Sequence, residues 1–202
     1  MSEQNRYERF EERYAMGRLP WDDELPPPEV MALVEKLAPG RALDLGCGYG
    51  RSAIYLARHG WQVDGVDFIQ KAVTEATKRA QEAKLVKKAT FYQGSVADLH
   101  FLNASYTLAI DVGCFHSLLA VDQLAYRDEL LRLLVPKAQF LLFARTTSGD
   151  EEPEDGPPTV DESHLKSLFE PHFQLEHIEI GTTQVEDKPL WNSAWFWYRK
   201  YG

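Results

Sequence analysis

A glycine-rich segment offers the most distinctive binding chemistry in this sequence. It runs Asp44-Leu45-Gly46-Cys47-Gly48-Tyr49-Gly50-Arg51 and separates a predicted strand from a predicted helix. Glycines in this pattern let the backbone turn tightly and come close to a ligand. The helix that follows offers unpaired N–H groups and the positive end of its dipole at the same place. The segment therefore predicts a ligand-binding loop.

The residues around this loop exclude two nucleotide-binding fingerprints and favour a third kind of ligand. The dinucleotide pattern G-x-G-x-x-G needs a glycine where Arg51 stands, and a P-loop needs a Lys-Ser/Thr pair that the segment lacks. Asp67 ends the next predicted strand, where a doubly wound fold presents a carboxylate to ribose. Because a carboxylate accepts from both ribose hydroxyls, Asp67 suits a ligand with a free diol. The alternative for Asp67 is a solvated residue at a strand end.

Together these features resemble the class I S-adenosylmethionine-dependent methyltransferases. The first motif of that family, an acid followed by G-x-G-x-G, matches Asp44 and the glycines at 46, 48 and 50. The resemblance implies S-adenosylmethionine as cofactor. The resemblance also implies that the loop backbone contacts the methionine part of this cofactor and that Asp67 contacts its ribose. The cofactor-binding residues implied in these two segments are Asp44, Gly46, Cys47, Gly48, Gly50, Asp67 and Phe68.

Residues 93–99, after the third predicted strand, resemble the adenine-contacting segment of the same family. Many members carry Asp where this chain has Ser95. The resemblance implies that the Ser95 hydroxyl and the Val96 N–H contact the edge of the adenine. The alternative is that both are ordinary residues at a strand end.

Two further segments are similar to the thiol, thiopurine and tellurite-resistance-type methyltransferases. One contains Pro20-Trp21-Asp22, and the other is residues 111–118. The likeness implies a small-molecule acceptor, a thiol or another soft nucleophile. Trp21 either covers the sulfonium, since an aromatic face attracts a cation, or anchors the arm to the core. Asp111, with Val112 beside it, either contacts the amino group of the cofactor or caps the next helix.

The implied reaction is an in-line displacement, for which alignment of donor and acceptor can supply about 7–11 kcal/mol of the barrier. A catalytic base is optional, because a thiol with a pKa near about 8.5 is partly ionised at neutral pH. His116 follows the fourth predicted strand at the edge where ligands bind. It is therefore the candidate catalytic base, and the alternative is a structural histidine bonded to backbone.

The elements that position these residues alternate between short apolar runs and helical patterns over residues 41–144. This alternation predicts a parallel sheet with crossover helices. Strands are predicted at 41–45, 62–68, 89–93, 106–111 and 138–144, and helices at 52–59, 69–80 and 122–134. Two β-rich segments, 173–180 and 193–200, predict an antiparallel pair. The predicted fold is α/β, a Rossmann-like seven-stranded, mostly parallel sheet with helices on both faces and an antiparallel C-terminal hairpin.

The ends of the chain are predicted as additions to this unit. Residues 1–27 are predicted to be an arm that covers the active site, and residues 28–202 to be the methyltransferase domain, which opens with a helix near Pro28. Thr159 and Glu162 form a capping-box pattern at the start of a later helix. The acidic run at 149–158 predicts a solvated loop.

The composition and net charge limit the classes of partner that the chain is expected to bind. The chain has 202 residues, of which 44% are hydrophobic, and this suits one soluble domain. A net charge of -9 disfavours nonspecific binding to nucleic acid or an anionic membrane. No segment reaches the ~18 apolar residues of a membrane span. Cys47 and Cys114 lack metal-ligand spacing, so a cytoplasmic protein without a metal site is expected.

Three functions remain open at this stage. The first is methyl transfer from S-adenosylmethionine to a thiol or other soft atom of a small molecule. The second keeps the cofactor but places the methyl group on nitrogen or oxygen of a metabolite, or on an RNA base. The third is a noncatalytic cofactor-binding module that pairs with a partner protein. The oligomeric state is not predicted.

Overall fold

A central β-sheet organises the structure, a computed structural model that describes residues 3–17, 19–147, 159–184 and 190–202. Within these residues the sheet has eight strands, and seven of them follow the order β3-β2-β1-β4-β5-β8-β7. The strands are β1 (Arg41–Leu45), β2 (Gln62–Asp67), β3 (Ala89–Gln93), β4 (Tyr106–Val112), β5 (Leu134–Thr147), β6 (Val160–Asp161), β7 (Phe173–Thr183) and β8 (Trp191–Lys200). The two-residue β6 pairs with β5 beside this path.

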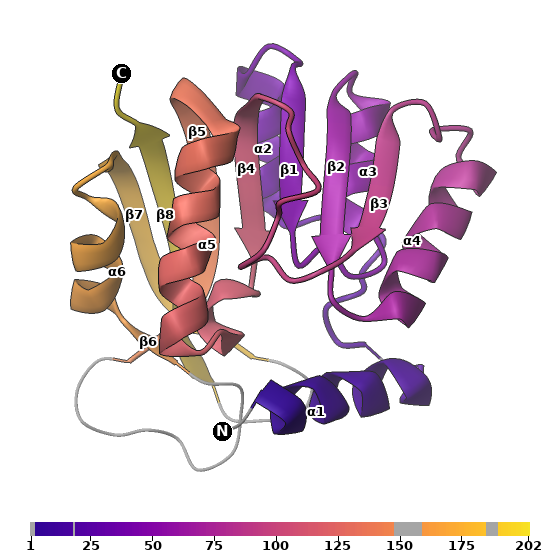
Figure 1. Ribbon diagram of the computed structural model, residues 1–202, viewed down its shortest axis with the longest axis horizontal. Helices are drawn as coiled ribbons and strands as arrows, with labels where there is room; N and C mark the ends of the chain where they lie inside the picture. Colours follow the sequence, from indigo (N-terminus) through magenta and orange to yellow (C-terminus); the bar gives the residue numbers. More distant parts are fainter. Residues whose placement is uncertain (1–2, 18, 148–158, 185–189) are drawn as a thin grey trace.

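The strand directions confirm the predicted fold. The pairs β1/β2, β2/β3, β1/β4 and β4/β5 are parallel. The last strand, β8, lies between β5 and β7 and runs antiparallel to both. The carboxyl ends of β1 to β4 therefore meet at one edge of the sheet, where α/β proteins bind ligands (Figure 1).

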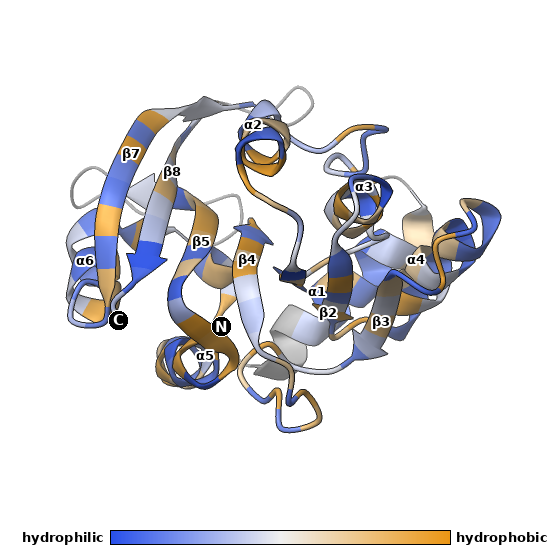
Figure 2. Cartoon of the chain, turned by 90° about the horizontal axis from the view of Figure 1, so that it is seen from above, coloured by the Kyte–Doolittle hydropathy of each residue, from blue (hydrophilic) through white to orange (hydrophobic). Residues whose placement is uncertain are grey.

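Helices cover both faces of the sheet (Figures 1 and 2). Buried side chains of α2 (Pro28–Lys36), α3 (Arg51–Arg58) and α4 (Gln70–Glu82) form one core cluster with the sheet. Those of α5 (Ala120–Leu133) and α6 (Glu162–Phe169) form the other. Amphipathic sequence explains these placements; in α2, for example, Val30, Leu33 and Val34 are buried on one side.

The N-terminal arm contains a helix that the sequence analysis missed. This helix, α1 (Glu3–Met16), lies below the carboxyl ends of the parallel strands (Figure 1). Its apolar side carries Tyr7, Phe10 and Tyr14, spaced by three and four residues, which join a cluster that includes Phe68 and Trp21. That spacing is the signal from which the helix was predictable. The division into an arm at 1–27 and a domain at 28–202 stays a prediction.

Two details differ from the sequence-based expectations. The helix α6 is capped by Asp161, whose carboxylate accepts the N–H groups of Ser163 and His164, so the prediction of a capping box at Thr159 was wrong. The reason is that Val160 and Asp161 are extended and pair with the end of β5. The strand β5 also begins earlier than predicted, directly after α5. The predicted acidic loop at 149–158 lies outside the described residues.

No helix in the described parts of the chain is long and apolar enough to cross a bilayer. Among the same residues, no group of three or more His, Cys, Asp or Glu side chains is arranged to hold a metal ion.

Candidate active site

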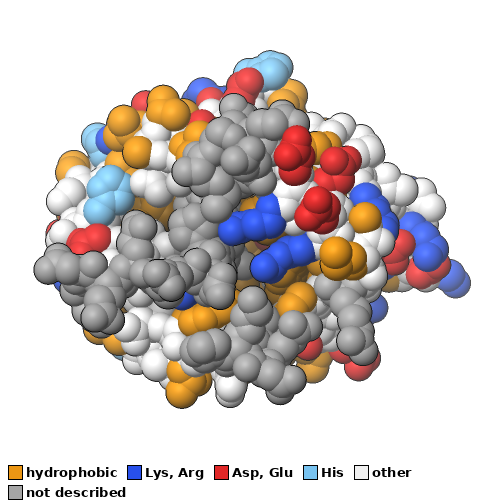
Figure 3. Space-filling view, turned by 90° about the horizontal axis from the view of Figure 1, so that it is seen from below, with side chains coloured by type: hydrophobic (Ala, Val, Ile, Leu, Met, Phe, Trp, Pro, Cys, Tyr) orange, Lys and Arg blue, Asp and Glu red, His pale blue; other side chains and the backbone are white. Residues whose placement is uncertain are grey.

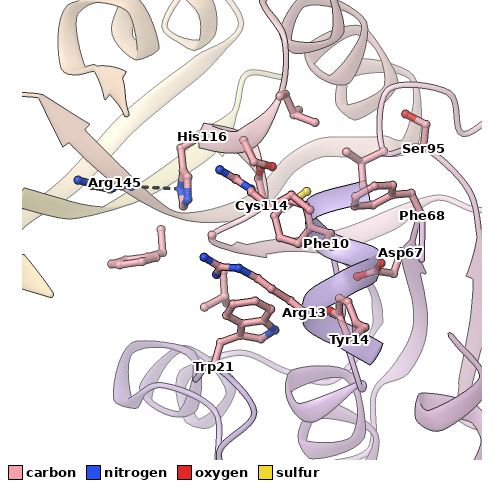
Figure 4. Close-up of a pocket in the computed structure, with 18 of the residues that line it drawn as sticks. Phe10, Arg13, Tyr14, Trp21, Asp67, Phe68, Ser95, Cys114, His116 and Arg145 are labelled. Carbon is pink, nitrogen blue, oxygen red and sulfur yellow. Dashed lines mark hydrogen bonds between the residues drawn. The ribbon is translucent and has the colours of Figure 1, made fainter. Parts of the chain in front are cut away.

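A cavity of about 230 Å³ lies between the carboxyl edge of the sheet and α1. Four loops, which follow β1, β2, β3 and β4, contribute to its wall, and α1 and the ends of β5, β7 and β8 complete it. Figure 4 shows Asp67, Phe68 and Ser95 at one end of the cavity and His116 and Arg145 at the other. The first end carries a carboxylate, and the second carries a histidine and an arginine.

The glycine loop is fastened to the neighbouring strand. The N–H groups of Gly46 and Cys47 both donate to the carbonyl oxygen of Val66, at 2.8 and 3.0 Å. Gly46 has φ +69°, and a Cβ built there would lie 2.4 Å from the Cβ of Cys114. Glycine is therefore required at this position for both its conformation and its size. Because the two N–H groups are already engaged, this part of the loop is better suited to a hydrogen-bond donor such as an ammonium group.

The carboxylate of Asp67 joins the loop to the end of β2. Its Oδ2 accepts the N–H of Gly48 at 2.9 Å, and its Oδ1 accepts the N–H of Ile69 at 2.9 Å. The side chain is 5% exposed, and burial raises its pKa to about 6. A carboxylate has about four acceptor sites, so two remain after these bonds. Because Asp67 lines the cavity, these two sites would suit the two hydroxyls of a ribose.

Two other predicted acids lie beneath the cavity rather than on its wall. Asp44 accepts the N–H of Ala53 at 3.0 Å and so fixes the start of α3. Asp111 is fully buried and accepts the N–H of Cys114 at 2.7 Å and the Tyr126 hydroxyl at 2.9 Å. Burial raises the pKa of each to about 7. For Asp111, the contacts are those of the capping alternative, because they hold the short 3-10 turn Phe115–Ser117 that follows β4.

Trp21 closes the cavity beside the glycine loop. Its ring contacts those of Phe10 and Tyr14, at centroid separations of 6.3 and 6.2 Å. The next residue, Asp22, forms a two-pronged ion pair with Arg79 of α4, with both N–O distances 2.7 Å. Trp21 therefore both lines the cavity and belongs to the segment that fixes the arm to the core.

His116 lies in the 3-10 turn after β4, and both of its ring nitrogens can be assigned. Its Nδ1 accepts the backbone N–H of Arg145 at 3.2 Å (Figure 4). Burial, with the charges of Arg145 and Arg9, lowers the pKa of His116 to about 4. At neutral pH the ring is therefore uncharged and carries its proton on Nε2. In this tautomer His116 offers a hydrogen-bond donor, and its one lone pair is already used.

Several cavity residues were not singled out from the sequence. Arg9 and Arg13 come from α1, and Arg145 comes from β5. Aromatic side chains of Phe143 and Trp191 lie on the same wall. Figure 3 shows the face that carries α1, with basic side chains near its middle next to hydrophobic ones. Pairing between β5, β8 and β7 brings Phe143, Arg145 and Trp191 to the cavity, which no local motif encodes.

The predicted site residues divide into two groups by position. Those that line the cavity are Trp21, Gly46, Asp67, Phe68, Ser95, Val96, Val112 and His116. Those that support its wall are Asp44, Cys47, Gly48, Gly50 and Asp111. Gly48 and Gly50 both have positive φ, and Gly50 immediately precedes α3. The cofactor contacts stay predictions, and so does the catalytic role of His116.

Comparisons with known proteins agree with this geometry. The sequence profile of a family described as "Methyltransferase domain" matches residues 42–137. A 2-heptyl-1-hydroxyquinolin-4(1H)-one methyltransferase of Mycobacteroides abscessus is 27% identical over 163 residues, which cover 80% of this chain and 71% of that protein.

Solved structures show the same architecture. One, described as "Conversion of a Disulfide Bond into a Thioacetal Group during Echinomycin Biosynthesis", has a TM-score of 0.76 and 26% identity, covering 91% of this chain and 86% of the other. The Burkholderia thailandensis 1,6-didemethyltoxoflavin-N1-methyltransferase, solved with its substrate and S-adenosylhomocysteine, has a TM-score of 0.77 and 23% identity, covering 98% and 87%. At 23% identity, the similarity to the second structure shows the fold alone.

The chain is thus a class I S-adenosylmethionine-dependent methyltransferase, as its motifs predicted. Its methyl donor is S-adenosylmethionine. The cavity fits this donor because the spare acceptor sites of Asp67 suit the ribose and the flat Phe68 ring suits the adenine.

Proposed function

We propose that the protein methylates a thiol, or a similarly soft atom, that enters the cavity already ionised. The observation that carries this proposal is the state of His116, whose Nδ1 lone pair is engaged and whose pKa is lowered to about 4. Among the described lining residues, the only carboxylate is Asp67, at the opposite end of the cavity. The described residues near His116 therefore offer no base to an acceptor that must lose a proton before it reacts. A thiol loses its proton to solvent, since its reference pKa is about 8.5.

The cofactor would lie along the glycine-loop end of the cavity. In this proposal Gly46 contacts the methionine part, Asp67 accepts from the ribose, and Phe68, Ser95 and Val96 surround the adenine. Bound S-adenosylmethionine supplies an electrophilic methyl group on a positively charged sulfur. The guanidinium of Arg13, whose central carbon is 5.6 Å from the centre of the Trp21 ring, is suited to the carboxylate of the methionine part.

The protein contributes orientation and exclusion of water. The aromatic side chains of α1 and Trp21 cover the cavity, and the ion pair between Asp22 and Arg79 holds this cover in place. His116 would donate its Nε2–H to the acceptor and so fix the direction from which the acceptor approaches. Such positioning is the main source of rate in a displacement of this kind.

Two of the similar proteins bear on the choice of acceptor. The structure from echinomycin biosynthesis concerns the chemistry of a disulfide, and this favours sulfur. The hydroxyquinolone methyltransferase acts on a bicyclic aromatic compound, and the Phe10, Phe143 and Trp191 rings that line the cavity suit such a compound. A nitrogen or oxygen atom of an aromatic metabolite is therefore the second candidate acceptor.

The test is release of S-adenosylhomocysteine and transfer of labelled methyl from S-adenosylmethionine to a panel of acceptors. The panel contains thiophenol, an alkyl thiol, tellurite, selenite, a hydroxyquinolone, small amines and bulk RNA. S-methylation is expected to be fastest, with a pH profile that follows the pKa of each thiol. Transfer to the hydroxyquinolone or amines alone would replace the thiol proposal by the second candidate. Tight cofactor binding with no acceptor methylated would favour the noncatalytic module.

A further inference from the structure

The end of the cavity opposite Asp67 is positively charged. Two basic side chains line it from separate elements, Arg9 from α1 and Arg145 from β5. Both lie near enough to His116 for their charges to lower the pKa of its ring. No carboxylate of the described residues forms an ion pair with Arg9. A guanidinium that is partly buried without an anion is unfavourable, and a carboxylate on a ligand would relieve this cost for Arg9.

The environment of Arg9 points to a missing hydrogen-bond acceptor. Its Nε is buried and has no hydrogen-bond partner within the described residues. Burial and the nearby charge of Arg13 lower the pKa of this guanidinium. A buried donor without an acceptor costs free energy, which a bound ligand that supplies the acceptor would restore.

The environment of Arg145 adds an aromatic surface to this charge. Arg145 is 4% exposed, and its central guanidinium carbon lies 4.2 Å from the centre of the Trp191 ring. The backbone of Arg145 is held in β5, where residue 145 pairs with Ser193 of β8. The Arg145 guanidinium and the Trp191 ring together form one part of the cavity wall, and His116 lies at the same end of the cavity as Arg145 (Figure 4).

We propose that the methyl acceptor is an aromatic or otherwise planar compound that carries a carboxylate, which Arg9 and Arg145 bind. This proposal rests on the proposed function, because it describes the acceptor of that same site. The carboxylate would accept from the unpartnered Arg9 Nε and from Arg145, while the flat part of the compound packs against the aromatic wall. The group that receives the methyl would then point toward the cofactor end.

The test measures binding of matched products to the protein loaded with S-adenosylhomocysteine, by calorimetry. The probes are 4-(methylthio)benzoate, uncharged thioanisole and cationic 4-(methylthio)benzylamine. We expect the carboxylate to bind about tenfold or more tightly than thioanisole, the worth of one charged hydrogen-bond pair, and the amine more weakly than either. Equal affinity of carboxylate and thioanisole would overturn the proposal.

Variants assign the preference to the two arginines. Arg9→Gln should reduce the preference for the carboxylate to about threefold or less, and Arg9→Lys should keep part of it. Arg145→Gln should do the same, provided that circular dichroism shows an intact fold. The control is Arg58→Gln, an exposed arginine of α3 away from the cavity, which should leave the preference unchanged. A preference that survives in Arg9→Gln and Arg145→Gln alike would contradict the assignment.

The anion could also belong to the cofactor, whose methionine part has its own carboxylate. In that case Arg9→Gln would weaken S-adenosylhomocysteine itself and leave the ratio between the probes unchanged, and the proposal would fail. Failure of the proposed function gives a different result. If thiols are not methylated while the carboxylate preference persists and depends on Arg9, the anion site stands and only the thiol assignment is lost.

Discussion

The Asp67 carboxylate accepts the backbone N–H of Gly48 at 2.9 Å, across 19 residues of chain. This bond ties the glycine loop to the end of β2, so one carboxylate both shapes the loop and faces the cavity. In the proposed complex, this single side chain would link cofactor binding to the conformation of the loop.

Replacing Asp67 should therefore affect both binding and stability. Asp67→Asn offers one oxygen where two N–H groups now bind, and it removes the charge. We expect the dissociation constant for S-adenosylhomocysteine to rise by a factor that corresponds to about 1.5–3 kcal/mol, with a lower melting temperature. Calorimetry and thermal unfolding measure the two effects. Asp128→Asn, at an exposed position, is the control, and an unchanged dissociation constant would remove Asp67 from the site.

The raised pKa of Asp67 adds a dependence on pH. The carboxyl is protonated below a pKa of about 6 and then loses acceptor sites for the ribose. The affinity of the wild-type protein for S-adenosylhomocysteine should fall as pH decreases from 7 to 5. Binding titrations of the folded protein at several pH values measure this change. In Asp67→Asn this part of the pH dependence should disappear. Parallel curves for both proteins would refute the assignment.

The glycine loop predicts that a side chain at position 46 is not tolerated. In Gly46→Ala the new methyl would lie 2.4 Å from the Cys114 Cβ at a φ of +69°, so the loop must move. We expect a loss of about 2 kcal/mol or more in the free energy of unfolding, with weaker cofactor binding. Gly181→Ala is the matched control, because nothing lies within 4 Å of its Cβ. Similar unfolding curves for the two variants would show that the loop tolerates a side chain.

The buried, uncharged state of His116 predicts how stability varies with pH. Its folded pKa is about 4, and the unfolded value is 6.5. As pH falls from 6.5 to 4, the unfolded chain takes up a proton that the folded protein does not, so stability decreases. The decrease from this group amounts to about 3 kcal/mol. His116→Gln keeps an acceptor for the Arg145 N–H and should remove this part of the decrease in urea unfolding. If the free energy of unfolding varied with pH equally in both proteins, the pKa of His116 would not be lowered in the folded state.

The ion pair between Asp22 and Arg79 predicts how firmly the arm is held. Arg79→Gln removes both of its 2.7 Å bonds to Asp22, and the pair is only partly buried. We expect a loss of about 1 kcal/mol or less in global stability but faster proteolysis of residues 3–27. The variant Arg58→Gln, at an exposed arginine of α3, should leave the cleavage rate unchanged. A cleavage rate in Arg79→Gln equal to that of the wild type would show that other contacts hold the arm.

The sequence identified the parts of the site that local motifs encode. The acid-glycine pattern at 44–50 and the acid at 67 are set by the turns they make, so their positions were predictable. The helix α1 was missed because its apolar side is short, although Tyr7, Phe10 and Tyr14 have helical spacing. The Thr159 capping box was wrong because a strand pairing to β5 overrides the local pattern.

The end of the cavity that contains His116 and Arg145 could not be predicted from local sequence motifs. Arg145 and Trp191 are 46 positions apart in the chain, and only the antiparallel pairing of β8 with β5 brings them to one wall. The proposed role of His116 as a donor depends on a backbone N–H that lies 29 residues away. Neither relationship has a signal in residue type or spacing.

The most direct test of the account is a crystal structure with S-adenosylhomocysteine. We expect its methionine part at the loop of residues 46–50, its ribose hydroxyls within hydrogen-bond distance of the Asp67 carboxylate, and its sulfur directed toward the His116 end. A ligand bound elsewhere, or in this cavity with its ribose away from Asp67, would contradict the account.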